Sequence, residues 1–218
     1  MNLTGDSGGG VISYAGEVRR KLVHLSSLWM PLAMVLCGES RRLSMCIAFA
    51  VLFVLSVFVE RLYVLGIPVI APLYKMIFGG MLRREPLPGQ WIVSGGPYVL
   101  GASSLALLFF PVSVAAPSLA VMLVGDTAAA LIGRRFGRHK VNGKSWEGCA
   151  AFVVFGYGGA ALFLGLAEAP ELLYIASVPA VCAAALAELF AKQLRVNDNF
   201  SIPVVFGSAA LLFGVVFG

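Results

Sequence analysis

Long uninterrupted apolar runs constrain the fold of this chain more than any other feature. Hydrophobic residues make up 59% of its 218 residues, and the few charged residues, 12%, are clustered between uncharged stretches. A soluble domain carries about 25% charged residues. Apolar runs of about 20 residues cross the hydrocarbon core as helices, whereas the strands of a barrel would alternate in polarity. The sequence therefore predicts an all-α integral membrane protein.

Charge and cysteine usage argue against several other classes. The net charge is +5 and the isoelectric point about 9.2, but the basic residues lie between apolar segments, as in membrane proteins. No nucleic-acid partner is therefore expected. None of the four cysteines forms a C-x-x-C pair, so neither a zinc site nor a disulfide framework is indicated. The first ten residues are polar and glycine-rich, unlike a cleavable signal.

One transmembrane domain over residues 1–218 is expected, with a flexible tail at 1–13 and a bundle of about seven transmembrane helices. The predicted spans are 22–37, 43–65, 91–110, 112–132, 148–167, 172–191 and 201–217. Segment 66–81 is short and contains Pro68, Pro72 and Lys75, so we expect it to be interfacial or re-entrant.

The distribution of basic residues favours this topology. With the N-terminus in the cytoplasm and 66–81 not crossing, Arg41 and Arg42 lie outside and every other Lys and Arg lies inside. If 66–81 crossed, the N-terminal basic cluster would move outside and the bias would weaken. The polar motifs are then expected on one, cytoplasmic, face.

The first polar motif is the run EVRRKLVH. Its spacing places Glu17, Arg20 or Lys21, and His24 on one helical face. The run is read either as a juxtamembrane anchor with an internal ion pair or as a polar stripe that belongs to a site.

The second motif is LVGDTAAALIGRRFGRHKVNGKSWEG, residues 123–148. Asp126 lies inside an apolar helix, where a carboxylate is costly and indicates a functional site. A basic loop follows, in which glycines permit close backbone approach and lysines and arginines bind phosphate oxygens. Gly143-Lys144-Ser145 resembles the end of a Walker A loop, but Arg138 stands where that motif needs its first glycine, and a helix precedes it. A soluble P-loop fold is rejected, and a glycine–lysine phosphate cradle is retained.

Two further polar regions follow the same pattern. Glu188 lies in an apolar helix, and the turn Asn197-Asp198-Asn199 either caps the next helix or supplies oxygen ligands to Mg²⁺. Arg83, Arg84 and Glu85 precede a loop, and Glu60 with Arg61 is expected to form an interfacial ion pair of structural role. Carboxylates, cations and glycine turns are the inventory of phosphoryl transfer. No hydrolase or zinc-enzyme motif is present in the sequence.

Three runs together resemble one family. E-x-x-RK-x-x-H at 17–24, GDTAAALIGRRFGRHKVNGKSWEG at 125–148 and E…NDNFSIP at 188–203 are similar to the dolichol kinase, phytol kinase and CTP-dependent diacylglycerol kinase family. The resemblance implies transfer of the γ-phosphoryl group of CTP, or another nucleoside triphosphate, to a lipid alcohol, with Mg²⁺. The compact chain looks more like the phytol-type and prokaryotic polyprenol kinases than like the longer dolichol kinases, so a prenol-type acceptor is preferred and diacylglycerol is second.

The resemblance also implies roles for particular residues. The expected catalytic residues are Asp126, Glu17, His24 and Glu147, with the general base left open among the first three. The expected phosphate-binding residues are Arg20, Lys21, Arg138, Lys140, Gly143, Lys144, Ser145 and Gly148. The expected metal ligands are Asp126, Asp198, Glu188 and Asn199.

The expected partners are a nucleoside triphosphate, a lipid alcohol and membrane lipids, with a homo-oligomer left open. The expected location is a prokaryotic cell membrane, with the site on the cytoplasmic face. Two alternatives are a cytidylyltransferase that makes a CDP-lipid, and a non-enzymatic transporter or lipid-binding protein in which the buried carboxylates relay ions.

Overall fold

The computed structural model describes residues 14–78, 94–194 and 196–217, and almost all of them are helical. The helices are α1 (Tyr14–Ser26), α2 (Trp29–Cys37), α3 (Arg42–Val64), α4 (Ile70–Phe78), α5 (Gly95–Phe109), α6 (Val112–Ala120), α7 (Asp126–Phe136), α8 (Trp146–Leu166), α9 (Glu171–Leu194) and α10 (Asp198–Phe217). Four short elements join them: the 3₁₀ turn η1 (Glu39–Arg41), the π-helical turn η3 (Val121–Gly125) and the antiparallel pair β1 (Lys140–Val141) and β2 (Lys144–Ser145).

Among the described residues, five helical stretches are long and apolar enough to cross a membrane. They are Glu39–Val64, Val112–Phe136, Trp146–Leu166, Glu171–Ala191 and Asp198–Val216. These stretches support a multi-pass, all-α membrane protein, but the predicted count of seven is not confirmed. Helix α5 has only 15 residues, and the first predicted span is divided into α1 and α2.

The break between α1 and α2 follows from Pro31 near the start of α2. A proline ring clashes with the carbonyl four residues earlier, which here belongs to Ser27, and cannot donate to it. The chain turns at Ser27 and Leu28 instead, and Met30 N donates to Ser27 O at 2.9 Å.

Helix α4 has nine residues, which at about 1.5 Å per residue is far short of the ~30 Å hydrocarbon core.

The core of the bundle is the rod formed by α6, η3 and α7, against which α8, α10, α5 and α2 pack. In the stretch Val112–Phe136, 72% of the most apolar 18-residue segment is buried. The corresponding share is 17% for Glu39–Val64, which packs mainly on α5. The central rod is rich in alanine and other small residues, which lets neighbouring helices approach closely.

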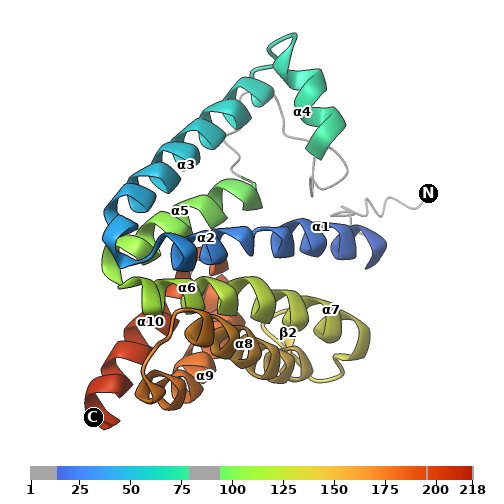
Figure 1. The fold of residues 1–218 in the computed structure, drawn as a ribbon. Helices are drawn as coiled ribbons and strands as arrows, with labels where there is room; N and C mark the ends of the chain where they lie inside the picture. The colour runs from blue at the N-terminus through green and yellow to red at the C-terminus, as the bar shows by residue number, and fades with distance from the viewer. Residues whose placement is uncertain (1–13, 79–93, 195, 218) are drawn as a thin grey trace, which may run out of the picture.

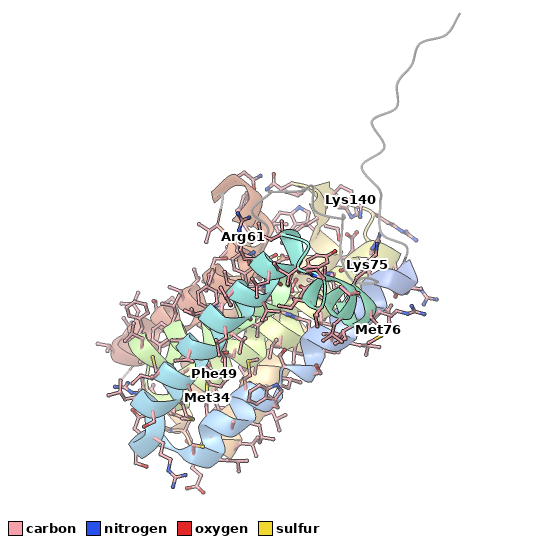
Figure 2. The ribbon with its side chains drawn as sticks, turned by 90° about the horizontal axis from the view of Figure 1, so that it is seen from above. Met34, Phe49, Arg61, Lys75, Met76 and Lys140 are labelled. Carbon is pink, nitrogen blue, oxygen red and sulfur yellow. The ribbon has the colours of Figure 1, made fainter. Side chains whose placement is uncertain are left out.

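The polar motifs gather at one end of the bundle. Figure 1 shows that α1 begins and α7 ends at the same end, beside β2, whereas the C-terminus and the α2–α3 turn lie at the opposite end. In Figure 2 the labelled basic residues Arg61, Lys75 and Lys140 lie toward one end, and Met34 and Phe49 lie toward the other. The assignment of this end to the cytoplasm stays a prediction. The predicted tail at 1–13 and the link with Arg83, Arg84 and Glu85 lie outside the described residues.

Candidate functional site

A buried ion pair between α1 and α7 forms the centre of the candidate site. Lys21 Nζ donates to Asp126 Oδ2 at 2.5 Å, and the two side chains are 1% and 12% exposed. His24 Nε2 lies 3.5 Å from the same carboxylate oxygen. A charge buried without its partner is strongly unfavourable, so Lys21 and Asp126 each require the other.

The local sequence places Asp126 directly after the π-helical turn η3. Such turns insert one residue into the helical ladder and occur frequently at functional sites. Gly125 lets this turn approach α8, because a Cβ at that position would lie 3.1 Å from the Phe152 ring. The Thr127 hydroxyl donates to the Leu123 carbonyl at 2.7 Å, which satisfies an acceptor in the irregular turn.

A second pair on α1 lies beside the first. Arg20 Nη2 donates to Glu17 Oε1 at 2.5 Å, and Arg134 Nη1 from α7 lies 3.6 Å from Glu17 Oε2. Burial opposes the charge of Arg20, but the hydrogen bond and charge of Glu17, with Asp126 and Asp198, outweigh burial and raise the Arg20 pKa above its ordinary value. Arg20 therefore stays charged next to the central pair.

The basic loop after α7 folds into a β-hairpin that the sequence analysis did not predict. Its turn residues Asn142 and Gly143 have φ of 55° and 83°, as an Asn-Gly hairpin turn requires. Lys140 Nζ donates to the Gly133 carbonyl at 3.2 Å, which ties the hairpin to α7.

Close packing explains two of the glycines in this region, Gly137 after α7 and Gly148 in the first turn of α8. A Cβ at Gly137 would lie 2.2 Å from the Gly133 carbonyl oxygen, and one at Gly148 would lie 2.8 Å from that of Ala129. The buried Ser145 caps α8 by accepting a hydrogen bond from Gly148 N at 3.1 Å. Ser145 and Gly148, predicted to bind phosphate, thus already hold each other, and Gly143 serves the turn.

Lys144 joins the hairpin to the end of α9 and the start of α10. Its Nζ donates to the carbonyl oxygen of Glu188 at 2.6 Å and to Glu188 Oε1 at 2.5 Å, and lies 3.7 Å from Asp198 Oδ2. Glu188 is 4% exposed. The charge of Lys144 also acts on Asp126. Lys144 therefore links the carboxylates of three helices, which makes one electrostatic cluster of the second and third motifs.

The remaining predicted site residues lie differently. Glu147 Oε1 lies 2.8 Å from His139 Nδ1, and His139 is 79% exposed, so this pair is on the outer side of the hairpin. Arg138 is exposed. Asn199 is buried, and its backbone N–H donates to Asn197 Oδ1 at 3.0 Å, which is the capping interpretation of that turn.

The carboxylates of the candidate site are possible ligands for a metal ion. Among the described residues, no group of three or more His, Cys, Asp or Glu side chains is arranged to hold a metal ion. Mg²⁺, however, is commonly held by one or two carboxylates together with substrate phosphates and water. The negative charges of Asp126 and Asp198 both favour the charged form of Arg20, and Asp198 is partly exposed. By themselves the described carboxylates therefore do not make a complete metal site, and a metal here would need ligands from outside this group.

Sequence reasoning missed the pairings that assemble this site. It singled out Lys21, Asp126, Lys144 and Glu188 but not which cation meets which carboxylate. One general signal was present, because a carboxylate in an apolar helix needs a cation from elsewhere in the bundle.

Comparisons with known proteins add little to this geometry. The chain is 28% identical over 208 residues to the uncharacterized protein RP860 of Rickettsia prowazekii (strain Madrid E), in an alignment covering 90% of this chain and 94% of that protein. No protein-family model matches the chain, and no solved structure matches it. Fold and site together define a multi-pass helical membrane protein with a buried cluster of charges at one end of its bundle.

Proposed function

We propose that this protein is a membrane kinase that transfers the γ-phosphoryl group of CTP, or another nucleoside triphosphate, to the hydroxyl of a lipid alcohol. The observation that carries the proposal is the cluster of Lys21, Arg20 and Lys144 around Asp126 and Asp198 at one end of an apolar bundle. Phosphoryl transfer needs cations that neutralise phosphate charge and groups that orient the attacking hydroxyl. The motif resemblance supports the same chemistry, because its residues come from separate helices and meet here.

The cations have a stated role in this proposal. Lys21 and Lys144 are held by Asp126 and Glu188, and phosphate oxygens offer these ammonium groups an equivalent charged acceptor. Asp126 and Asp198, and from the sequence pattern Glu188 and Asn199, are the residues that would hold Mg²⁺, which would supply further neutralisation of the phosphate charge.

The proton acceptor we favour is His24. Glu17 is engaged by Arg20 and Arg134, and Asp126 is assigned to the cations. His24 Nε2 is buried, makes no hydrogen bond to any residue that the structure describes, and lies 3.5 Å from Asp126 Oδ2. In the proposed step Nε2 takes the proton of the lipid hydroxyl, the hydroxyl oxygen bonds to the γ-phosphorus, and the bond to the β-phosphate oxygen breaks. The products are a lipid phosphate and a nucleoside diphosphate.

A label-transfer assay tests the proposal. Purified protein in detergent with Mg²⁺ would receive phytol, a polyprenol or diacylglycerol, each with γ-labelled CTP and then γ-labelled ATP. We expect label in a prenol-type lipid, loss of transfer in Asp126→Asn, and unchanged transfer in Glu171→Gln, a matched carboxylate on the exposed first turn of α9 at the other end of the bundle.

Two results would overturn the kinase proposal. Release of pyrophosphate from CTP when phosphatidate is supplied, with no labelled lipid, would indicate a cytidylyltransferase. Absence of any turnover by well-folded protein with all three lipids would favour the transporter or lipid-binding alternative.

A further inference from the structure

Helix α4 has an amphipathic pattern with its apolar side turned outward. Leu73, Met76 and Ile77 are 51%, 77% and 55% exposed, and their spacing places them on one face of α4. Val69, in the turn just before the helix, is 75% exposed. Tyr74, between them in sequence, is 8% exposed and points to the protein. A helix in water would show the opposite arrangement, so the outer face of α4 requires an apolar environment.

The inner face of α4 is held by a buried carboxylate that the proposed chemistry does not use. Glu60, 5% exposed near the end of α3, accepts a hydrogen bond from Tyr74 Oη at 2.9 Å. Its other oxygen accepts from Ser94 N at 2.8 Å, and the Ser94 hydroxyl also donates to Glu60. The Tyr74 ring stacks on Tyr63 with centroids 4.4 Å apart.

These contacts fix the orientation of α4. Glu60 joins α3, α4 and the residue that precedes α5, so the face of α4 that carries Tyr74 cannot turn outward without breaking them. Burying a carboxylate is costly unless its oxygens are satisfied. The arrangement specifies which side of α4 is presented to the surroundings.

Exposed apolar side chains also lie toward the end of the candidate span that precedes α4. On α3, Phe58 is 57% exposed, and Leu65, just beyond its end, is 55% exposed. Helix α4 follows α3 directly and lies at the end of the molecule where α1 begins, as Figure 1 shows, and Figure 2 places Met76 and Lys75 on that side. An apolar face at the end of a membrane span meets the boundary between lipid chains and headgroups.

We propose that α4 is a membrane-surface helix. Its apolar face, Leu73, Met76 and Ile77, and the preceding residue Val69 lie at the headgroup–acyl boundary of the leaflet on the side of the candidate site, and Glu60 is the positioning residue that holds the helix there. The occupant of this face is phospholipid. The proposal is independent of the kinase function and stands if that function fails.

Depth-dependent fluorescence quenching tests the location. The full chain, with its native cysteines replaced and monodispersity checked, would carry one bimane label at Met76→Cys in phosphatidylcholine bilayers. Nitroxides on shallow or deep positions of the lipid chains would serve as quenchers. We expect the shallow nitroxide to quench the Met76 label more strongly, and the deep nitroxide to quench a control label at Val51→Cys, 51% exposed in the middle of α3.

Other quenching patterns would overturn the location. Stronger quenching at Met76 by the deep nitroxide would mean a re-entrant helix. Quenching by aqueous iodide and by neither nitroxide would mean that the face lies in water. Protection from all three quenchers would mean that protein covers it.

The role of Glu60 has its own test. In Glu60→Gln, with the label at Met76→Cys, we expect the ratio of shallow to deep quenching to fall by at least about twofold as α4 loses its fixed orientation. Tyr74→Phe removes one of the hydrogen bonds and should give a smaller fall, and it keeps the test available if Glu60→Gln does not fold. An unchanged ratio in both variants would remove Glu60 from the positioning of α4.

Discussion

Asp126 and Glu60 are both carboxylates buried in apolar helices at the same end of the molecule, yet their surroundings differ completely. Asp126 lies in the most buried candidate span and pairs with the ammonium group of Lys21. His24 lies 3.5 Å from it, and the positive charges of Arg20 and Lys144 interact electrostatically with its carboxylate. Glu60 lies in the least buried candidate span, and its described hydrogen bonds come from a phenol, a hydroxyl and a backbone amide.

Burial of a carboxylate therefore does not by itself identify a chemical site. The described donors to Glu60 are neutral, and they fix helices in place. Cations around Asp126 can exchange a carboxylate for a phosphate without losing a charged partner.

Lys21→Met should have the largest effect on stability. It leaves the Asp126 carboxylate buried without its main cation, which costs about 3–5 kcal/mol. Thermal unfolding in detergent measures the loss. The double variant Lys21→Met with Asp126→Asn should recover most of the stability, because both charges are then removed. Equal unfolding temperatures for the single and double variants would show that the pair is not coupled.

His24→Asn should reduce phosphoryl transfer by about 100-fold or more, as loss of a general base does. Binding of the nucleotide, followed with a fluorescent analogue, should change little, because the imidazole is assigned to the lipid hydroxyl. Transfer at the wild-type rate would exclude His24 as the base and leave Asp126 for that role.

Lys144→Met should destabilise the protein by about 2 kcal/mol, because it removes the donor to the buried Glu188 carboxylate and to the carbonyl at the same residue. It should also weaken nucleotide binding in the same titration. Addition of Glu188→Gln should restore part of the stability without restoring binding. If both properties return together, Lys144 acts only through Glu188.

Glu60→Gln should cost about 1 kcal/mol, since the amide oxygen still accepts a hydrogen bond from one of its donors. Phosphoryl transfer in detergent should remain close to that of the wild type, in contrast to Asp126→Asn. A loss of transfer as large as that of Asp126→Asn would contradict this contrast, because Glu60 would then be needed for phosphoryl transfer.

His139→Ala should have the smallest effect. The His139–Glu147 pair is exposed, and exposed ion pairs contribute little to stability. No measurable change in unfolding temperature or in transfer is expected. A clear loss of transfer with an unchanged unfolding temperature would return Glu147 to the set of site residues.

Much of the secondary structure could be predicted because hydropathy is a local property. The predicted spans 43–65, 148–167 and 172–191 correspond closely to α3, α8 and α9. The hairpin at 140–145 was missed because its strands have two residues each and carry no periodicity. The first predicted span, 22–37, is divided between α1 and α2. Pro31 breaks the helical hydrogen-bond pattern but leaves the mean hydropathy of the segment high, so the break was not predicted.

By itself the sequence determined that this is a helical membrane protein, since apolar runs need lipid and their backbones need internal hydrogen bonds. It also identified Asp126 and Glu188 as carboxylates whose burial in apolar helices is costly, and Lys144 as part of a loop of the kind that binds phosphate. Only the tertiary structure decided that Lys21 meets Asp126 across 105 positions of sequence and that Lys144 meets Glu188 across 44. The reason is physical: the cost of burying a charge is local to its helix, whereas the partner that offsets this cost depends on how the helices pack.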